Sequence, residues 1–369
     1  MNKGFWENLA KEGKGIFCLA PMADVTDAAF RRLIAKYGKS DVMWTEFVSA
    51  DGLMHPAGRE KLMVDLMYTE AERPIVAQIF GSNVENMRGA AKFIAELGFD
   101  GVDINMGCPD KTIEKQGAGA AHIKDANHAR EIIRAVKQGV EDAGKNIPVS
   151  VKTRVGYNKV TLDEWIPEIL SEDIAVLTVH ARTRKEMSLV PARWEHVKEA
   201  VAIRDKMGKE TLIIGNGDVK DLEDGRKKIK QTGCDGVMLG RAIFGNPWLF
   251  SNLHANALPD NGAQNSSSLR HENFLLKIFS VRRRRDSRAL SKEKFYTPSL
   301  REKLGVMVEH TKLFEEILGG SKNFAIMKKH YKAYVNNFDG AKELRVKLME
   351  SAETASDVER IVEEFLAKI

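Results

Sequence analysis

Gly101-Val102-Asp103-Ile104-Asn105-Met106-Gly107-Cys108-Pro109 is the stretch of this chain that decides its fold. Its first half is an apolar run with the length of a buried strand. The run must end at Pro109, because proline donates no ladder hydrogen bond and the glycine before it allows a tight bend. The turn therefore presents the thiol of Cys108 where a ligand can reach it. We interpret Cys108 as a reactive group; this stretch alone leaves open the alternative of a small buried residue.

Length and composition bound the class of protein. The 369 residues exceed the size at which a single core usually stops growing, so we expect a large domain and a smaller one. Three cysteines without repeated spacing predict neither a disulfide framework nor a zinc site, and Cys18 and Cys234 are expected to be structural. The polar N-terminus and the absence of a long apolar run indicate neither a signal peptide nor a membrane span. We expect a cytoplasmic monomer that holds no metal.

Short apolar runs alternate with helix-period segments through the first two thirds of the chain, which is typical of parallel strands joined by helices. Eight such runs within about 230 residues predict an α/β fold, a closed (β/α)8 TIM barrel. A doubly wound open sheet is disfavoured because no glycine-rich dinucleotide motif follows the first run. The expected strands are 16–22, 42–48, 75–80, 102–105, 149–154, 176–180, 212–216 and 237–241.

After residue 252 the strand pattern stops. Residues 253–296 are expected to form a basic linker or insertion, and 297–369 a small all-helical C-terminal domain, behind a barrel of residues 1–252. Eleven Lys and Arg against four Asp and Glu fall within 265–303, although the net charge of the whole chain is only +5. Arg282, Arg283, Arg284 and Arg285 are either a contact for a polyanion or solvated charge.

The expected strand ends carry polar side chains, and in such barrels the functional groups gather at these ends. Lys152 and Arg154 alternate along one strand and therefore point to the same face, the interior or its mouth, where two cations need an anionic partner. Glycine-bearing turns follow the last two strands and suit backbone amides that approach a phosphate. The sequence thus predicts an extended phosphorylated cofactor. The residues that we single out at or just after the strand ends are Pro21, Met22, Ala23, Gln78, Asn105, Cys108, Lys152, Arg154, His180, Arg182, Asn216, Gly217, Asp218, Gly240 and Arg241.

These motifs together resemble those of the tRNA-dihydrouridine synthases, flavin enzymes that reduce specific uridines in tRNA. The resemblance covers nearly all of 16–252 and resumes at about 297. Lys328-Lys-His-Tyr-Lys-Ala-Tyr334 and Glu343-Leu-Arg345 resemble the helical tRNA-binding domain of that family. The barrel motifs are Leu19-Ala-Pro-Met-Ala-Asp-Val-Thr-Asp27, Asp103-Ile-Asn-Met-Gly-Cys-Pro109, Gly117-Ala-Gly-Ala-Ala121, Val151-Lys-Thr-Arg154, His180-Ala-Arg-Thr-Arg184, Asn216-Gly-Asp218 and Gly240-Arg241.

The resemblance implies a site and a reaction. Asn105, Arg154 and Arg182 would meet the uracil, and Cys108 would be the general acid that protonates C5 after hydride from reduced FMN reaches C6. NADPH, or NADH, would reduce the flavin again. Residues implied to bind tRNA are Lys328, Lys329, Lys332 and the arginines 282–285. Those implied to hold FMN are Pro21, Met22, Ala23, Gln78, Lys152, His180, Asn216, Gly217, Asp218, Gly240 and Arg241.

Two features depart from the family pattern. The segment 253–296 is longer than the resemblance leads us to expect, and Ala181 stands where the family often has glycine. Two alternatives remain open at this point. One is an FMN-dependent barrel that acts on a free pyrimidine, similar to dihydroorotate dehydrogenase. The other is a non-catalytic RNA-binding relative that keeps the fold.

Overall fold

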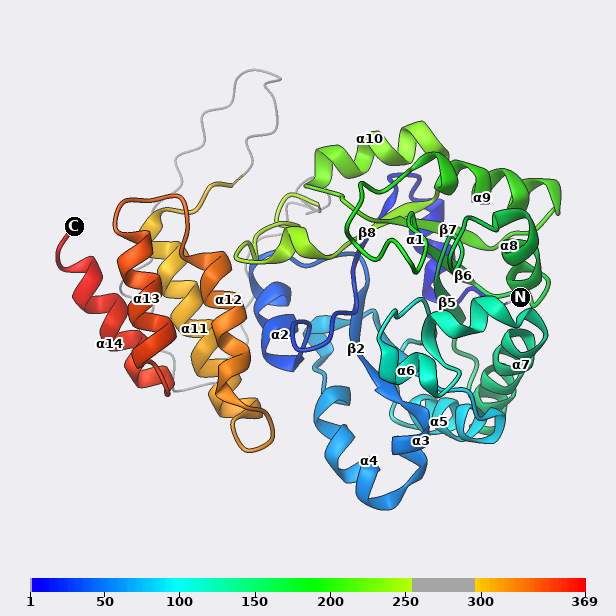
Figure 1. Cartoon of the computed structure of the whole chain (residues 1–369), viewed down its shortest axis with the longest axis horizontal. Helices are drawn as coiled ribbons and strands as arrows, with labels where there is room; N and C mark the ends of the chain where they lie inside the picture. The colour runs from blue at the N-terminus through cyan, green and yellow to red at the C-terminus, as the bar shows by residue number, and fades with distance from the viewer. Residues whose placement is uncertain (1, 254–295) are drawn as a thin grey trace, which may run out of the picture.

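Eight parallel strands form the centre of the molecule in the computed structural model, which describes residues 2–253 and 296–369 (Figure 1). The strands hydrogen-bond in the order β1-β8-β7-β6-β5-β4-β3-β2. The two ends of this sheet meet, because Cys18 of β1 bridges Val42 and the N–H of Leu19 donates to the Val42 carbonyl over 3.0 Å. The predicted TIM barrel is confirmed. The strands are β1 (Ile16–Leu19), β2 (Met43–Ser49), β3 (Ile75–Phe80), β4 (Gly101–Met106), β5 (Val149–Arg154), β6 (Val176–His180), β7 (Leu212–Asn216) and β8 (Gly236–Leu239).

Helices follow the strands and cover the outside of the barrel. Their inner faces show the predicted period: in the helix after β3, Met87, Ala90, Ala91, Ile94 and Ala95 are buried. The helices of this part are α1 (Phe5–Lys11), α2 (Ala28–Tyr37), α3 (Ala50–Met54), α4 (Pro56–Leu62), α5 (Val84–Glu96), α6 (Lys111–Lys115), α7 (Ala126–Asp142), α8 (Leu162–Leu170), α9 (Glu195–Lys206) and α10 (Leu222–Thr232). Short 3-10 helices are η1 (Met63–Leu66), η2 (Glu70–Glu72), η3 (Gly119–Lys124) and η4 (Arg241–Ile243).

Some predicted strand ends were wrong. β1 ends at Leu19 rather than at residue 22, because Pro21 has no N–H for the ladder. β8 ends at Leu239 rather than at residue 241, because Arg241 already begins η4. β4 runs one residue further than expected, since Met106 still pairs with Thr153 of β5. The second strand is shifted by one residue, to Met43–Ser49.

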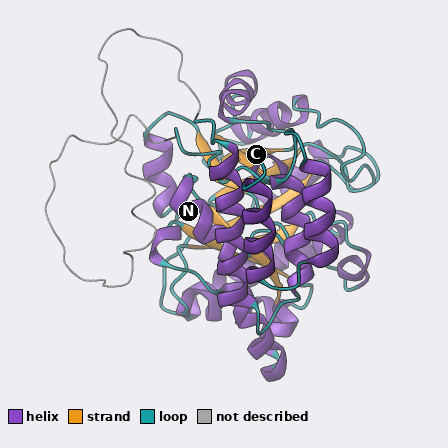
Figure 2. Ribbon diagram, turned by 90° about the vertical axis from the view of Figure 1, so that its left-hand side faces the viewer, coloured by secondary structure: helices purple, strands orange, loops and turns teal. Residues whose placement is uncertain are grey.

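A bundle of four helices follows the barrel and lies beside it (Figures 1 and 2). Its elements are α11 (Leu300–Leu318), η5 (Phe324–Ile326), α12 (Met327–Tyr334), α13 (Ala341–Ser351) and α14 (Ala355–Leu366). This confirms the predicted helical C-terminal part, while the limits 1–252, 253–296 and 297–369 stay a prediction. Arg282, Arg283, Arg284 and Arg285 lie outside the described residues. No helix of the described chain has both the length and the apolar character to cross a membrane.

Aromatic rings and ion pairs join the bundle to the barrel. Phe30 of α2 packs against the rings of His310 and His330, with ring centroids 4.9 Å apart in both cases. Lys322, between α11 and η5, forms ion pairs with Glu46 of β2 and, over 2.7 Å, with Asp65 of η1. Burial alone would lower the pKa of Lys322, but the two carboxylates outweigh it and hold that pKa above its ordinary value. The lysine therefore stays charged at the interface.

Removing this cation should destabilise the protein. The side chains of Lys322 and Glu46 are only 12% and 6% exposed, so Lys322→Met would leave two carboxylates without their counter-ion. We expect the free energy of unfolding to fall by about 3 kcal/mol, measured by urea denaturation. As a control, Lys347→Met breaks an exposed pair with Glu364 and should cost less than about 1 kcal/mol. Equal effects of the two variants would contradict this account of the interface.

Candidate active site

Asn105, at the end of β4, shapes the turn that carries Cys108. Its Oδ1 accepts hydrogen bonds from the N–H groups of Gly107, over 3.1 Å, and Cys108, over 2.8 Å. The Cys108 carbonyl in turn accepts from Ala120 N over 2.9 Å. Gly119 has φ +60°, and a Cβ there would lie 2.8 Å from the Cys108 carbonyl oxygen, so only glycine allows this approach. The turn is therefore held from both sides.

A chain of buried hydrogen bonds supports Asn105 from inside the barrel. Asn105 Nδ2 donates to Gln78 Oε1 over 2.9 Å, and Gln78 Nε2 donates to Asp103 over 2.6 Å. Ser150 of β5 donates to the other oxygen of Asp103. Burial raises the pKa of Asp103 to about 6, although the bonds from Ser150 and Gln78 oppose this. Sequence reasoning missed Asp103 as a site residue; a carboxylate within an apolar run was the signal that could have found it.

Arg154, at the end of β5, braces two loops. Its Nε donates to the Gly107 carbonyl over 2.7 Å, and its Nη1 donates to the carbonyls of Thr183 and Met187 over 3.2 and 3.0 Å. The guanidinium thus joins the Cys108 turn to the loop after β6. Within the described chain Nη2 of Arg154 has no hydrogen-bond partner, so two of its N–H groups are free to meet a ligand.

Positive charge at the mouth exceeds negative charge. Lys152 is partly buried, and its ammonium forms neither an ion pair nor a hydrogen bond with the described residues. Burial, together with the charge of Arg154, lowers the pKa of Lys152 to about 8, while Asp103 acts in the opposite direction. Burial also lowers the pKa of Arg154 to about 10. Two cations held at such cost favour an anionic ligand between them.

Asp218, after β7, is shared by two arginines. It forms ion pairs with Arg182 and, over 2.6 Å, with Arg241. Burial alone would raise the pKa of Asp218, but the hydrogen bonds from Arg182 and from the N–H of Ala192 hold it below its usual value. Nη1 of Arg182 lies 3.1 Å from Nε2 of His180, and burial keeps the pKa of His180 well below its ordinary value. The imidazole is therefore neutral and accepts from the arginine.

Free backbone N–H groups lie where β7 and β8 end. Outside the strands and helices, no backbone hydrogen bond within the described residues is donated by the N–H of Gly217, Asp218, Gly240 or Arg241. Asn216 donates from Nδ2 to the Met238 carbonyl over 2.8 Å and so ties the two strand ends together. Such N–H groups after the last two strands are what a phosphate needs.

The remaining predicted cofactor residues lie after β1, next to the end of β8. Pro21, Met22 and Ala23 follow β1, and the Met22 sulfur would lie 3.4 Å from a Cβ built on Gly240, so the ends of β1 and β8 are neighbours. Among the described residues, no group of three or more His, Cys, Asp and Glu could hold a metal ion.

The three cysteines differ in exposure as expected. Cys18 and Cys234 are buried, whereas Cys108 is partly exposed. Burial is also the main reason why the pKa of Cys108 lies above its ordinary value, with the charges of Lys152 and Arg154 opposing it. The thiol at the mouth is therefore protonated at neutral pH.

The three lysines of α12 that are predicted to bind RNA differ in the partners of their ammonium groups. Lys328 donates to the Met349 carbonyl within the bundle over 2.6 Å. Lys329 forms an ion pair with Asp24, after β1, over 2.9 Å. Lys332 is exposed and has no ion pair with the described residues. Tyr331 and Tyr334 are buried in the bundle core, so they offer no stacking surface.

The geometry first defines a class: a closed parallel barrel with a thiol and a surplus of cations at the carboxyl ends of its strands. The family model described as Dihydrouridine synthase (Dus) matches residues 18–369. The chain belongs to the dihydrouridine synthase family, a family of flavin-dependent enzymes built on a TIM barrel. The family predicted from the motifs is confirmed.

Individual relatives agree with this assignment. The chain is 44% identical over 251 residues to a "Probable tRNA-dihydrouridine synthase 2" of Bacillus subtilis (strain 168), which covers 68% of this chain and 74% of that protein. It is 33% identical over 371 residues to a "Probable tRNA-dihydrouridine synthase" of Staphylococcus epidermidis (strain RP62A), with 100% and 98% covered. Among solved structures, the old yellow enzyme homologue from Zymomonas mobilis matches with a TM-score of 0.45 at 13% identity, over 66% of this chain and 89% of that one.

The role of Asn105 as a support can be tested. Asn105→Ala would leave the N–H of Gly107, the N–H of Cys108 and the oxygen of Gln78 without their partner. Because such buried groups are costly, we expect the free energy of unfolding to fall by about 2 kcal/mol in urea denaturation. Asn158→Ala removes an exposed amide and should change the stability by less than about 0.5 kcal/mol. An Asn105→Ala variant as stable as the parent would show that the turn stands without this side chain.

Proposed function

We propose that this protein reduces uridines in tRNA to 5,6-dihydrouridine, with FMN at the barrel mouth and NADPH as the reductant. The observation that carries the proposal is the position of Cys108. A partly exposed, protonated thiol stands on a braced turn beside the unpaired cation Lys152. The names of the relatives point to the same reaction.

The residues at the mouth fit FMN. The free N–H groups after β7 and β8, with Arg241, would receive its phosphate, and Lys152 would supply the positive charge that favours an anionic ring. When bound, FMN supplies the hydride that uracil C6 accepts. The residues that would hold it are Pro21, Met22, Ala23, Gln78, Lys152, His180, Asn216, Gly217, Asp218, Gly240 and Arg241.

Cys108 would complete the reduction. Once C6 has gained a hydride, the electron pair of the former double bond lies on C5 and its neighbouring carbonyl. The proton on Cys108 Sγ would pass to C5, and water would then return a proton to the thiolate. The free Nη2 group of Arg154 and the remaining Nδ2–H of Asn105 are suited to the uracil carbonyls. Arg182, bonded to Asp218, would contribute its positive charge.

The uridine must leave the tRNA stack to reach this site, at a cost of a few kcal/mol. Phosphate contacts must hold the RNA meanwhile. Lys332 is free for such a contact, while Lys328 and Lys329 would have to give up partners within the protein.

The activity itself is tested with the purified flavoprotein, NADPH and unmodified tRNA. We expect dihydrouridine in the tRNA, detected by nucleoside mass spectrometry, and oxidation of the flavin by tRNA but not by free uracil or orotate. Oxidation by the free pyrimidines instead would favour the dihydroorotate dehydrogenase-like alternative. A preparation without flavin would favour the non-catalytic one.

Replacing the thiol should stop the chemistry and spare the cofactor. Because a general acid contributes about 100-fold or more, we expect Cys108→Ser to lower the single-turnover rate of dihydrouridine formation at least about 100-fold with full flavin content. Cys234→Ala, which changes a buried cysteine, serves as the matched control and should retain the rate of the parent. Undiminished reduction by Cys108→Ser would refute the acid role.

The thiol also predicts a pH dependence. Burial places the pKa of Cys108 above its ordinary value of about 8.5, so the proton donor is present through neutral pH and is lost as pH rises through the raised pKa. We therefore expect the ratio of the parent rate to the Cys108→Ser rate to stay level up to about pH 8.5 and to fall above it. Taking the ratio removes the titration of Lys152, which both proteins share. A ratio that falls between pH 6 and pH 8 would contradict this assignment.

A further inference from the structure

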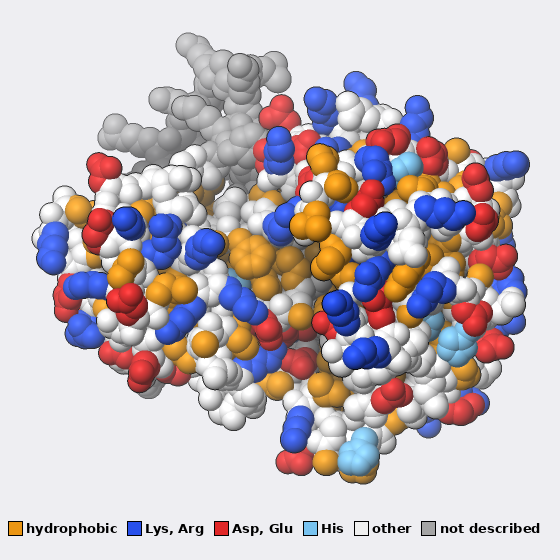
Figure 3. All heavy atoms as spheres, viewed as in Figure 1, with side chains coloured by type: hydrophobic (Ala, Val, Ile, Leu, Met, Phe, Trp, Pro, Cys, Tyr) orange, Lys and Arg blue, Asp and Glu red, His pale blue; other side chains and the backbone are white. Residues whose placement is uncertain are grey.

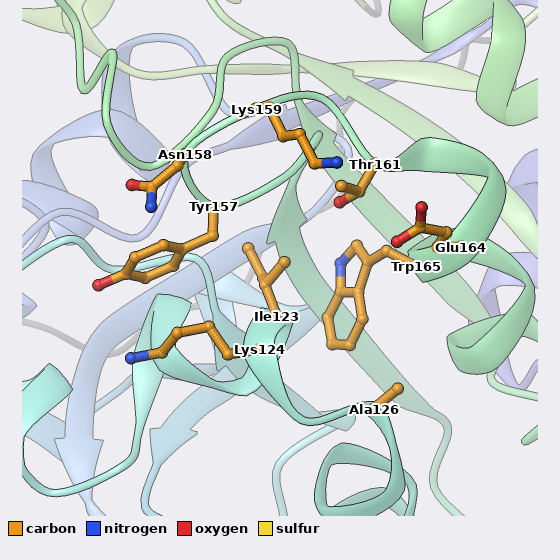
Figure 4. Close-up of a pocket in the computed structure, with 9 residues that line it drawn as sticks. All are labelled: Ile123, Lys124, Ala126, Tyr157, Asn158, Lys159, Thr161, Glu164 and Trp165. Carbon is orange, nitrogen blue, oxygen red and sulfur yellow. The ribbon is translucent and has the colours of Figure 1, made fainter.

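A cavity of about 410 Å³ opens beside the barrel mouth, outside the predicted active site (Figure 4). It lies between η3, which follows the Cys108 turn, and the loop that joins β5 to α8. None of the predicted catalytic or cofactor residues lines it. The lining residues are Ile123, Lys124, Ala126, Tyr157, Asn158, Lys159, Thr161, Glu164 and Trp165.

The cavity combines an apolar, aromatic surface with polar groups at its edge. Ile123 and Tyr157 supply the accessible apolar part. Trp165 also lines the cavity but is only 2% exposed, and its indole N–H donates to Thr153 over 3.0 Å. Asn158 and Glu164 offer a donor and acceptors at the edge. A flat apolar surface rimmed by hydrogen-bonding groups is complementary to a nucleobase, and the volume suits a single nucleotide.

The charge around the cavity suits a nucleic acid. Lys124 lies over the ring of Tyr157, 4.7 Å from its centroid, and both Lys124 and Lys159 are exposed. Neither lysine forms an ion pair within the described ranges 2–253 and 296–369. Lys111 and Lys115 of α6 and Lys185 of the loop after β6 are likewise exposed and unpaired there. Glu164 would repel a phosphate close to it, so we place the phosphates near Lys124 and Lys159. These five lysines lie on α6, on η3 and on the loops after β5 and β6. They exceed what one small nucleotide needs and fit a polymer.

The loop after β6 lies between the cavity and the predicted active site. The Tyr157 carbonyl accepts from Lys185 N over 2.9 Å, and the Arg184 guanidinium lies 5.4 Å from the Tyr157 ring centroid. Arg184 and Lys185 belong to the loop after β6 whose Met187 carbonyl accepts from Arg154. One loop therefore borders both the cavity and the uracil site.

The cavity also lies across the mouth from the helical bundle. In the ring of eight strands β5 is opposite β1, and the bundle contacts α2, β2 and the loop after β1. In Figure 3 basic side chains lie on both the bundle and the barrel. An RNA that crosses the mouth from the bundle would thus reach the cavity on the far side.

We propose that this cavity holds an unstacked nucleotide of the tRNA other than the target uridine, with its base beside Ile123 and Tyr157 and its phosphates near Lys124 and Lys159. The inference rests on the proposed function, since it takes tRNA to be the substrate. It adds a second contact with the RNA, opposite the bundle, which would fix the direction in which the tRNA lies across the mouth.

Two variants test the proposal through binding of unmodified tRNA to the flavoprotein, measured by fluorescence anisotropy at several salt concentrations. Ala126→Phe fills the cavity and leaves every charge in place; we expect about tenfold weaker binding with the same salt dependence. Lys124→Ala combined with Lys159→Ala should also weaken binding about tenfold and reduce the slope of log K against log salt by about 1 to 2. Lys145→Ala, an exposed lysine between α7 and β5, is the control and should change neither quantity.

The KM for NADPH shows whether the cavity binds NADPH, the other phosphate-bearing ligand, instead of tRNA. A raised KM for NADPH with unchanged tRNA binding would assign the cavity to the reductant and overturn the proposal. Parent-like tRNA binding by both variants would overturn it as well. Should Ala126→Phe lower the melting temperature, the double lysine variant decides, because its side chains are exposed. Since binding is measured without turnover, a parent that binds tRNA and fails to reduce it would refute the proposed function and leave this test in force.

Discussion

The oxygen of one buried amide sets the geometry of the barrel mouth. Asn105 accepts from two successive N–H groups of the turn after β4, and its own N–H is held by Gln78, which is held in turn by Asp103. Asn105, Gln78 and Asp103 are each hydrogen-bonded on both sides of this network, which therefore fixes a single arrangement rather than costing stability. The turn bears the one cysteine that is exposed to the mouth, and its position therefore depends on side chains that react with nothing.

A surplus of positive charge follows from the same arrangement. Lys152 and Arg154 alternate along β5, while the nearby carboxylates are either deep in the barrel, as Asp103 is, or occupied, as Asp218 is by Arg182 and Arg241. A protein keeps cations in such a place only when a ligand supplies the missing negative charge. The cations at the mouth thus favour an anionic ligand, and the guanidinium of Arg154 links that region to the loop that borders the neighbouring cavity.

The lysines of the bundle and of the barrel differ in how many of them are already paired within the protein. Lys322 and Lys329 hold the bundle against the barrel, and Lys328 binds a carbonyl within the bundle. Their charge is already neutralised or engaged, so it attracts a polyanion less than free charge would. Lys332 of the bundle is unpaired within the described residues, and a further group of unpaired lysines lies on α6, on η3 and on the loops after β5 and β6, across the mouth from the bundle.

Sequence alone predicted the barrel and most of its strands. Runs such as 75–80, 149–154, 176–180 and 212–216 match the strands residue for residue, because the apolar residues of each run mark a buried strand even where polar side chains such as Lys152 and Arg154 lie near its end. The first and last strands were predicted too long, because Pro21 and Arg241 lie in the turns that follow them. Asn105 and Arg154 were expected to meet the uracil, yet most of their hydrogen bonds go to the protein.

The residue types and their order along the chain therefore determined the fold, the partly exposed thiol and the polar groups that lie where the strands end. What only the tertiary structure decided is which partner each polar side chain takes. Asp103 reaches Ser150 across 47 positions, and Lys322 reaches Glu46 across 276. Such contacts form only when the ring of strands closes and the bundle packs against it. A local sequence pattern spans too few residues to specify a contact between positions so far apart.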